Sequence, residues 1–304
     1  GFEEINNNKN NSSFIGNIHK VKFTDTLNFL KKNNYSINHC LITSKYLSKI
    51  DFEKENFEKK ISLLSTIKKT HKSKDYKDFV KKITFLNREL KEHQLKSLYH
   101  LFNAKSAANF SVPGSGKTSV ILAYFEMLKL QKKVDAIFVI GPKSCYHSWS
   151  TEFKINLNRD PNLQILGPNR KERHGVYRRK IESELFTAHF QTIKNDIEHL
   201  KKFFSYNKFL LVIDEAHNIK KIDGIWSNSI INLSLSSEYK AILTGTPLPN
   251  NLKDVYNYLD FLYHDLKNRR IQSKALLQLQ RMMVHKPSPL VAILDNTLTW
   301  KVIP

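Results

Sequence analysis

Short apolar runs alternate with amphipathic segments between residues 86 and 264, and this pattern constrains the fold more than any other feature of the sequence. The apolar runs lie at residues 109–112, 136–140, 184–188, 209–213 and 241–243. The segments between them, such as 119–130 and 196–204, have helical character. Consecutive apolar positions are typical of strands that are covered on both faces. Their alternation with helices predicts an α/β domain with a doubly wound parallel sheet.

The regions on either side of this domain differ from it in composition and in the pattern of apolar residues. Residues 21–85 are Lys-rich, and apolar residues in 52–67 recur at helical spacing. For residues 1–85 this predicts a small, mainly helical region with a basic surface, or alternatively an incomplete domain. The first 20 residues are Asn-rich and polar, so we expect them to be frayed or loosely docked. Residues 265–304 are basic and weakly patterned, which favours a linker or extension.

The charge balance points to a polyanionic partner. The chain carries 49 Lys and Arg against 28 Asp and Glu, a net charge of +21. Such an excess favours nucleic acid, although a solvated Lys-rich surface would give the same count. No run of 18 apolar residues and no apolar leader are present, so we expect no membrane partner. Cys40 and Cys145 sit in no ligand spacing, which excludes a disulfide scaffold and suits a cytoplasmic location.

The sharpest local signal is SVPGSGKT at residues 111–118, between an apolar run and a helix. Backbone N–H groups of such a loop bind phosphate oxygens, and glycines let the backbone approach closely. Lys117 would reach the β- and γ-phosphates of ATP, and Thr118 would hold Mg²⁺. The alternative is a glycine turn before an ordinary helix. The predicted nucleotide-binding residues of this loop are Pro113, Gly114, Ser115, Gly116, Lys117, Thr118 and Ser119.

A second signal is DEAH at residues 214–217, directly after an apolar run. The carboxyl ends of parallel strands are where α/β sheets bind ligands. Asp214 would support Mg²⁺, and Glu215 would orient or deprotonate the attacking water. His217 could pass the state of the γ-phosphate to neighbouring motifs. The alternative is that Asp214 only caps the next helix. Together with the phosphate loop, however, the acidic strand end indicates an ATP-hydrolysing enzyme.

These motifs stand in an order that resembles a known family. The chain is similar to the N-terminal RecA-like lobe of superfamily 2 helicase-type ATPases, closest to the Swi/Snf class of DNA translocases. Residues 241–262, AILTGTPLPNNLKDVYNYLDFL, resemble the long motif III of that class, with Pro249 in place of Gln. Residues 140–153, IGPKSCYHSWSTEF, resemble motif Ia. The superfamily loop A-x-x-G-x-G-K-T also accommodates Ser111. The resemblance covers roughly residues 85–264.

The resemblance implies roles for further residues. Gln94, in LKEHQLKSL at 90–98, matches the glutamine that reads adenine. The motif Ia loop and the segment HFQTIKNDIEHL at 189–200 imply contacts to the nucleic-acid backbone, and motif III implies coupling between nucleotide and nucleic acid. For Trp149 and Phe153 of motif Ia we expect core packing. The implied nucleic-acid-binding residues are Lys143, Ser144, Gln191, Thr192, Thr244, Gly245 and Thr246.

A basic cluster at residues 169–180, NRKERHGVYRRK, lies outside these motifs. It carries six cations against Glu172, so it would either grip phosphates or form a solvated loop. The two interpretations stay open on sequence alone.

The family also implies a second RecA-like lobe that supplies arginine fingers, and no such lobe fits after residue 264. We therefore expect the chain to bind nucleotide better than it hydrolyses it. The leading hypothesis is the motor lobe of a double-stranded DNA translocase that uses ATP and Mg²⁺. The alternatives are a strand-separating DEAH-type helicase and a basic nucleic-acid-binding module with a non-hydrolysing pocket. The Asn- and Lys-rich composition suggests a prokaryotic host; in a eukaryote the protein would be nuclear.

Overall fold

The computed structural model describes residues 2–8, 11–16, 74–219, 225–245, 256–262, 291–294 and 300–303. The chain divides into two units, Gly1–Glu55 and Asn56–Pro304. In the first unit, β1 (Phe2–Asn8) and β2 (Asn11–Gly16) pair as an antiparallel hairpin. This hairpin was not predicted for the segment that we expected to be frayed or loosely docked. Because Asn is depleted in strands, the Asn-rich composition did not predict this strand pairing, which needs only backbone hydrogen bonds. The predicted helical segment at 52–67 lies outside the described residues.

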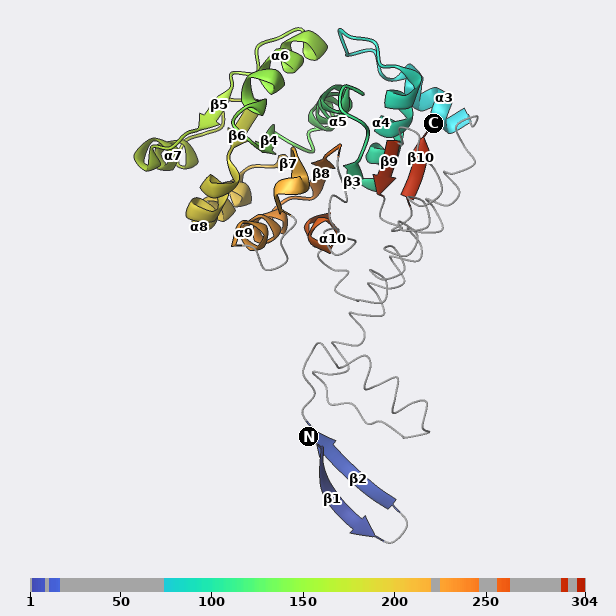
Figure 1. Ribbon diagram of the computed structural model, residues 1–304, viewed down its shortest axis with the longest axis vertical. Helices are drawn as coiled ribbons and strands as arrows, with labels where there is room; N and C mark the ends of the chain where they lie inside the picture. The colour runs from blue at the N-terminus through green and yellow to red at the C-terminus, as the bar shows by residue number, and fades with distance from the viewer. Residues whose placement is uncertain are drawn as a thin grey trace. The chain divides into compact units, whose positions relative to one another are not determined.

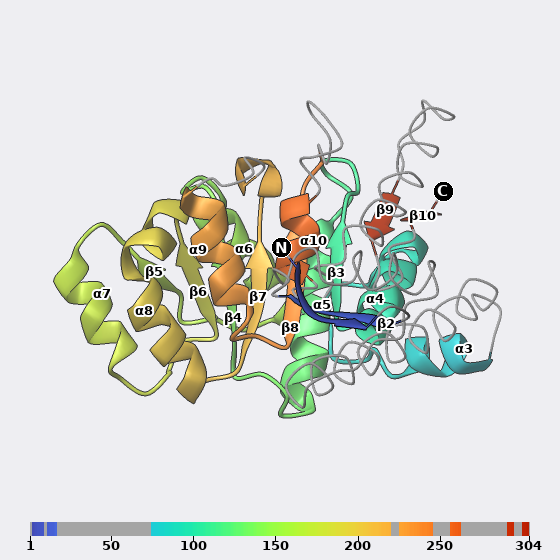
Figure 2. The same ribbon diagram turned by 90° about the horizontal axis from the view of Figure 1, so that it is seen from below.

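Six parallel strands form the centre of the second unit, in the spatial order β5-β6-β4-β7-β8-β3. Figure 2 shows these strands side by side. The predicted parallel α/β sheet is therefore confirmed. The strands are β3 (Ser106–Asn109), β4 (Ala136–Ile140), β5 (Gln164–Leu166), β6 (Leu185–Ala188), β7 (Phe209–Ile213) and β8 (Tyr239–Leu243).

Apart from shifts of one or two residues at the starts of β6 and β8, two of these strands differ from the sequence-based expectation. The run at 109–112 was expected to be a strand, but β3 ends at Asn109. The Asn109 side-chain oxygen accepts a hydrogen bond from the Ser111 backbone N–H at 3.0 Å, a local turn that ends the strand. Beyond Asn109, Phe110 is buried whereas Val112 is exposed. The short strand β5 was missed, because it lies at an edge of the sheet and its residues are partly exposed.

The sheet continues beyond β3 with two strands from the C-terminal region. β9 (Val291–Leu294) pairs antiparallel with β3, and β10 (Trp300–Ile303) pairs antiparallel with β9. These strands fall in the segment 265–304, which the sequence analysis assigned to a linker or extension. An apolar run of four residues is too short to predict a strand by itself. These segments form strands because β9 pairs with β3, which is distant in the sequence, and β10 pairs with β9.

Helices cover both faces of the sheet (Figure 1). One face carries α4 (Glu92–Ala104), α5 (Lys117–Leu130) and α6 (Cys145–Leu157). The other carries α8 (Phe190–Tyr206), α9 (Ile225–Ser234) and α10 (Tyr256–Leu262). The shorter elements are α3 (Lys74–Lys81) beside α4, α7 (Arg170–Tyr177) beside α8, and the 3₁₀ turn η1 (Ala216–Ile219) after β7.

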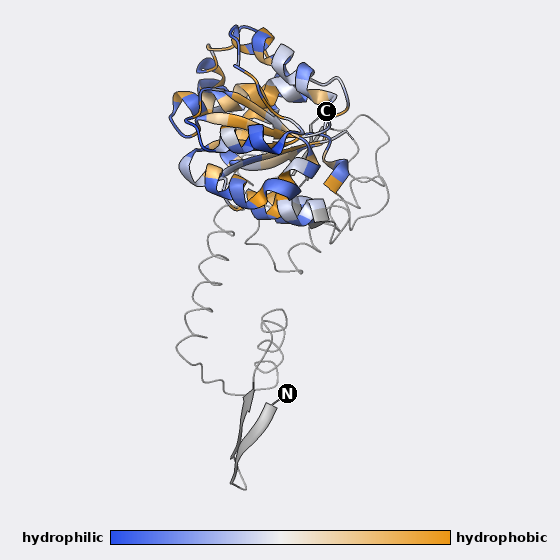
Figure 3. Ribbon diagram, turned by 90° about the vertical axis from the view of Figure 1, so that its left-hand side faces the viewer, coloured by the Kyte–Doolittle hydropathy of each residue, from blue (hydrophilic) through white to orange (hydrophobic). Residues whose placement is uncertain are grey.

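The core lies between these layers, and Figure 3 shows apolar strands between helices that carry hydrophilic residues. Along β4, Ile137 and Val139 face one core while Phe138 and Ile140 face the other, as strand geometry requires. No helix in the described ranges is long and apolar enough to cross a membrane.

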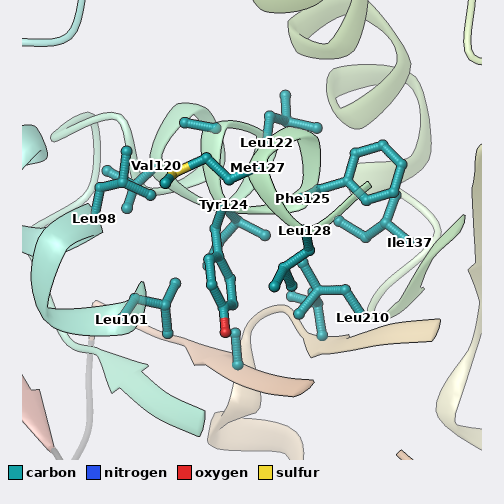
Figure 4. Packing of buried hydrophobic residues seen from close by; sticks show 14 of the residues in the cluster. Leu98, Leu101, Val120, Leu122, Tyr124, Phe125, Met127, Leu128, Ile137 and Leu210 are labelled. Atoms are coloured by element: carbon teal, nitrogen blue, oxygen red, sulfur yellow. The ribbon is translucent and has the colours of Figure 1, made fainter. Parts of the chain in front are cut away.

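Helix α5 is the centre of one core and carries the phosphate loop at its N-terminus. Nearly all of its residues are buried between α4, α6 and the sheet, and Figure 4 shows its apolar side chains in contact with those of its neighbours. The Tyr124 hydroxyl, deep in this core, donates to the Lys105 carbonyl at 3.0 Å. A helix that is apolar all round can only be stable when it is enclosed in this way. The enclosed helix therefore holds the loop at its N-terminus in a fixed position.

Candidate nucleotide and nucleic-acid site

The predicted site residues gather at the carboxyl ends of the parallel strands. The phosphate loop follows β3, the motif Ia turn follows β4, the DEAH residues follow β7, and Thr244 follows β8. The strands β4 and β7 are neighbours, but α6 and α9, which follow them, cover opposite faces of the sheet. Such a reversal opens a crevice at the sheet edge and marks the usual ligand site of open α/β sheets.

The phosphate loop has the conformation that its glycines make possible. Gly114 and Gly116 have φ angles of 78° and 80°, in the left-handed region that favours glycine, and α5 begins directly after Gly116. The Lys117 ammonium turns back into the loop and donates to the carbonyls of Ser111 at 3.0 Å and Val112 at 3.2 Å. The strand, loop and helix expected around residues 111–118 are present, and phosphate binding by this loop stays a prediction.

Electrostatics tie this lysine to the acidic strand end. Burial lowers the pKa of Lys117, and the charges of Glu215 and Asp214 act in the opposite direction. The loop and the DEAH segment, separated by almost a hundred residues in sequence, therefore form one charged site. A partly desolvated ammonium that interacts with two carboxylates is an electrostatically perturbed group of the kind that gathers at functional sites.

Asp214 is held on both oxygens. Its Oδ2 accepts from the Trp149 indole Nε1 at 2.8 Å, and its Oδ1 accepts from the Glu215 backbone N–H at 2.9 Å. Burial raises the pKa of Asp214, while the hydrogen bonds from Trp149 and Glu215 lower it. Glu215 has a φ of 50°, which is costly for a residue with a side chain and is typical of functional sites. His217 Nδ1 lies 3.1 Å from Glu215 Oε2.

The residues present fit a magnesium–nucleotide complex. The Asp214 carboxylate and the Thr118 hydroxyl are the hard oxygen donors that Mg²⁺ prefers. The raised pKa of Asp214 shows that its buried charge lacks full compensation, so a cation there would be stabilising. In the described part of the chain no three His, Cys, Asp or Glu side chains gather around one point, so phosphate oxygens would have to complete the coordination. Ser115 Oγ is buried and meets no hydrogen-bond partner among the described residues.

Gln94 lies against the loop. Its Nε2 donates to the Ser115 carbonyl at 2.9 Å, and its Oε1 accepts from the Lys91 backbone N–H at 2.9 Å. His93, which the sequence analysis did not single out as a site residue, places Nε2 at 3.2 Å from the same Ser115 carbonyl. Only its position next to Gln94 could have indicated this. The contact of Gln94 with adenine stays a prediction.

Three of the implied nucleic-acid-binding residues line one groove beside this site. Lys143 comes from the motif Ia turn, and Gln191 and Thr192 come from the first turn of α8. The groove has a volume of about 680 Å³, and its lining includes the apolar residues Ile165 and Leu166. Ser144 directly precedes α6, next to Lys143. The lining of the groove therefore combines a cation with polar groups. The groove lies at the same carboxyl edge of the sheet as the phosphate loop.

Motif III lies elsewhere. The Thr244 backbone N–H donates to the Asn109 carbonyl at 3.3 Å, and a Cβ at Gly245 would approach Pro113 Cδ to 2.9 Å. Thr244 and Gly245 thus pack against the phosphate loop and do not line the groove. Thr246 lies outside the described residues.

The basic cluster 169–180 divides into two parts. Arg173 is buried and donates to Asp196 at 2.5 Å and 3.0 Å, and also to the carbonyls of Gly167 and Pro168, each at 2.8 Å. Arg173 is therefore structural, and the i, i+4 spacing of Arg173 and Tyr177, which both contact Asp196, was the available signal. The exposed cations are Arg170, Lys171, Arg178, Arg179 and Lys180.

Fold and candidate site together define an α/β lobe with a glycine-containing loop between a strand and a helix, and with a groove at the carboxyl edge of its sheet. The chain belongs to the SNF2-related domain family, whose model matches residues 59–282. This confirms the resemblance to Swi/Snf-type superfamily 2 ATPases and the RecA-like class of the fold. Trp149 and Phe153, which are 1% and 0% exposed, also pack in the core as expected.

Individual relatives agree with this assignment. The chain is 30% identical over 193 residues to the ISWI chromatin-remodeling complex ATPase ISW1 of Saccharomyces cerevisiae. It is 30% identical over 189 residues to the human SWI/SNF-related matrix-associated actin-dependent regulator of chromatin subfamily A member 1. These alignments cover 60% and 59% of this chain but only 16% and 17% of the relatives, so the chain spans less than a fifth of their length.

A solved structure shows the same fold. The Sulfolobus solfataricus SWI2/SNF2 ATPase core in complex with dsDNA matches with a TM-score of 0.51 and 23% sequence identity. The match covers 65% of this chain and 41% of that one.

Proposed function

We propose that this chain contains the ATP-binding lobe of a Swi/Snf-type motor that hydrolyses ATP in order to move along double-stranded DNA. One observation carries the proposal: Lys117 and the carboxylates of Asp214 and Glu215 meet at one sheet edge, beside the groove that Lys143 lines. An enzyme that couples nucleotide hydrolysis to nucleic acid needs these two sites next to each other. The relatives named as remodelling ATPases, and the solved core bound to dsDNA, support this function.

The chemistry follows from the geometry of the chain's own residues. Lys117 would exchange the carbonyls of Ser111 and Val112 for phosphate oxygens, a stronger charge-assisted interaction. Thr118 and Asp214 would hold Mg²⁺, which when bound offsets the charge of the phosphates. Glu215 would orient the attacking water and take its proton. His217, 3.1 Å from the Glu215 carboxylate, would keep that group in place.

The groove would bind the DNA backbone. Lys143 supplies a cation, and Gln191 and Thr192 supply polar groups at the first turn of α8. Such contacts reach phosphates and sugars and carry no sequence information, so binding should be independent of sequence and sensitive to salt.

Fast turnover would need a second RecA-like lobe. Lys117 would lie on one side of the bound phosphates, and a cation from the opposite side would stabilise the transition state. Related phosphoryl-transfer enzymes gain about 10³–10⁵ in rate from such an arginine. The 1–304 chain should therefore bind nucleotide well and turn it over slowly.

Nucleotide binding tests the proposal. Lys117→Ala should weaken the binding of ATP and Mg²⁺ by about 10–100-fold, because a hydrogen bond from a charged group is removed. Glu215→Gln should keep binding and lose hydrolysis, because only the carboxylate that activates water changes. Lys202→Ala is the matched control, since Lys202 is exposed on α8. If Lys117→Ala bound as well as the control did, the assigned site would be wrong.

Competition between nucleic acids tests the type of motor. Blunt duplex DNA should bind at least as tightly as single-stranded DNA of the same length. A clear preference for the single strand would instead favour the strand-separating helicase.

A further inference from the structure

Helix α6 touches both halves of the nucleotide site through one face. Trp149 and Glu152 are three residues apart and therefore lie on the same side of the helix. Trp149 is 1% exposed and packs in the core, yet its indole N–H donates a hydrogen bond to Asp214 Oδ2 at 2.8 Å. Glu152 Oε2 accepts from the Ser119 hydroxyl at 3.2 Å, in the first turn of α5. The helix thus contacts the DEAH strand end and the helix of the phosphate loop; Figure 1 shows α5 and α6 on the same face of the sheet.

The same helix begins at the groove. Lys143 lines the groove, and α6 starts two residues later. The turn before α6 is packed tightly against the acidic strand end: a Cβ at Gly141 would lie 2.9 Å from Cys145 Sγ and 3.3 Å from Asp214 Cβ. Only glycine fits this approach without a shift. The path from the groove to the Asp214 carboxylate is therefore short and closely packed.

We propose that Trp149 is a positioning residue that fixes the orientation of the Asp214 carboxylate, and that α6 transmits nucleic-acid contact at residues 143–144 to the nucleotide site through it. The inference rests on the proposed function and names a route for its coupling. The last torsion of an Asp side chain is broad, so a carboxylate held by one hydrogen bond can rotate. With Trp149 on Oδ2 and the Glu215 N–H on Oδ1, the Asp214 carboxylate has one orientation.

Trp149→Phe isolates the indole N–H, because phenylalanine keeps most of the buried aromatic volume. The Mg²⁺ concentration that gives half-maximal Mg²⁺-dependent nucleotide binding should rise about tenfold, the value expected for losing a hydrogen bond to a charged group. Nucleotide affinity in EDTA should not change, because the phosphate loop is intact. Tyr124→Phe is the matched control: it removes one hydrogen bond from a buried aromatic residue in the same core, and the partner of that hydrogen bond, the Lys105 carbonyl, lies outside the candidate site. Its Mg²⁺ requirement should equal that of the unmodified chain.

Blunt duplex DNA tests the transmission. Saturating DNA should lower the Mg²⁺ requirement of the unmodified chain several-fold and leave that of Trp149→Phe unchanged. An equal effect of DNA on both proteins, or on neither, would overturn the coupling route. If the unmodified chain binds ATP and Mg²⁺ but Trp149→Phe titrates in the same way, the positioning role alone fails. If the unmodified chain binds no ATP, the proposed function fails and the inference with it.

A measurement on the unmodified chain covers the case in which Trp149→Phe does not fold. The sequence has three tryptophans, so three indole N–H resonances are expected in a ¹⁵N-labelled sample. Trp226→Phe and Trp300→Phe assign two of them and leave Trp149. Addition of Mg²⁺ to the nucleotide-bound protein should shift the Trp149 resonance most. A Trp149 resonance that does not respond would overturn the proposal.

Discussion

Two glycines of the phosphate loop provide a matched pair for testing its geometry. Gly114 and Gly116 have nearly the same φ, so alanine at either position meets the same backbone penalty of about 1–2 kcal/mol. Their surroundings differ: a Cβ at Gly114 meets nothing within 4 Å, whereas a Cβ at Gly116 would overlap Gln94 Nε2. Gln94 would then have to leave the Ser115 carbonyl and the Lys91 N–H. These two hydrogen bonds contribute about 0.5–1.5 kcal/mol each.

We therefore expect Gly114→Ala to cost about 1–2 kcal/mol of unfolding free energy and Gly116→Ala about 2–5 kcal/mol. Urea denaturation followed by circular dichroism gives both values. In a Gln94→Ala background, the cost of Gly116→Ala should fall to that of Gly114→Ala, because the overlapping amide is gone. Equal costs for the two single variants would refute the proposed contact of Gln94 with the loop.

Three further predictions concern the buried ion pair of Arg173 and Asp196, the exposed cations of the basic cluster and the half-buried thiol of Cys145. Arg173→Met should destabilise the fold by about 3–5 kcal/mol, because it leaves the Asp196 carboxylate buried without its partner. Burial acts to raise the pKa of Asp196, but hydrogen bonds from Arg173 and Tyr177 hold it below its usual value. The loss of unfolding free energy caused by Arg173→Met should therefore shrink as pH falls below about 4, as urea denaturation at several pH values can measure. Neutralising the exposed cations should reduce the slope of log DNA affinity against log salt by about 0.9 for each DNA phosphate that they neutralise. An unchanged slope would mean that this surface is only solvated. The four residues to replace are Arg170, Lys171, Arg178 and Arg179. Burial raises the pKa of the Cys145 thiol to about 12, so iodoacetamide should modify it far more slowly than free cysteine at pH 8, as mass spectrometry can measure.

The sequence predicted the central sheet well where strands are buried on both faces. The strands Ala136–Ile140 and Phe209–Ile213 were expected with the observed bounds, because five consecutive apolar residues between polar ones leave little choice. The edge strand Gln164–Leu166 and the strands Val291–Leu294 and Trp300–Ile303 were not predicted. Their regularity comes from pairing with distant strands, which a local pattern does not contain.

The candidate site was predicted through its motifs but not through its contacts. Lys117, Asp214 and Glu215 could be assigned because their residue types and spacing are fixed by phosphate chemistry. The hydrogen bond from Trp149 to Asp214 could not be predicted. A tryptophan in an apolar pattern is already explained by core packing, so the pattern gives no sign of a polar role. Arg173 was grouped with the exposed cations for the same reason: charge in a sequence does not reveal a buried partner such as Asp196.

Simultaneous binding of nucleotide and DNA tests the central claim most directly. Isothermal titration of the 1–304 chain with ADP and Mg²⁺, in the absence and presence of saturating blunt duplex DNA, measures both sites in one protein. The account predicts that both ligands bind together and that DNA changes the nucleotide affinity by about fivefold or more, with the reciprocal effect on DNA affinity. Loss of nucleotide binding when DNA saturates the chain would show that both ligands compete for one surface, and would contradict separate, adjacent sites.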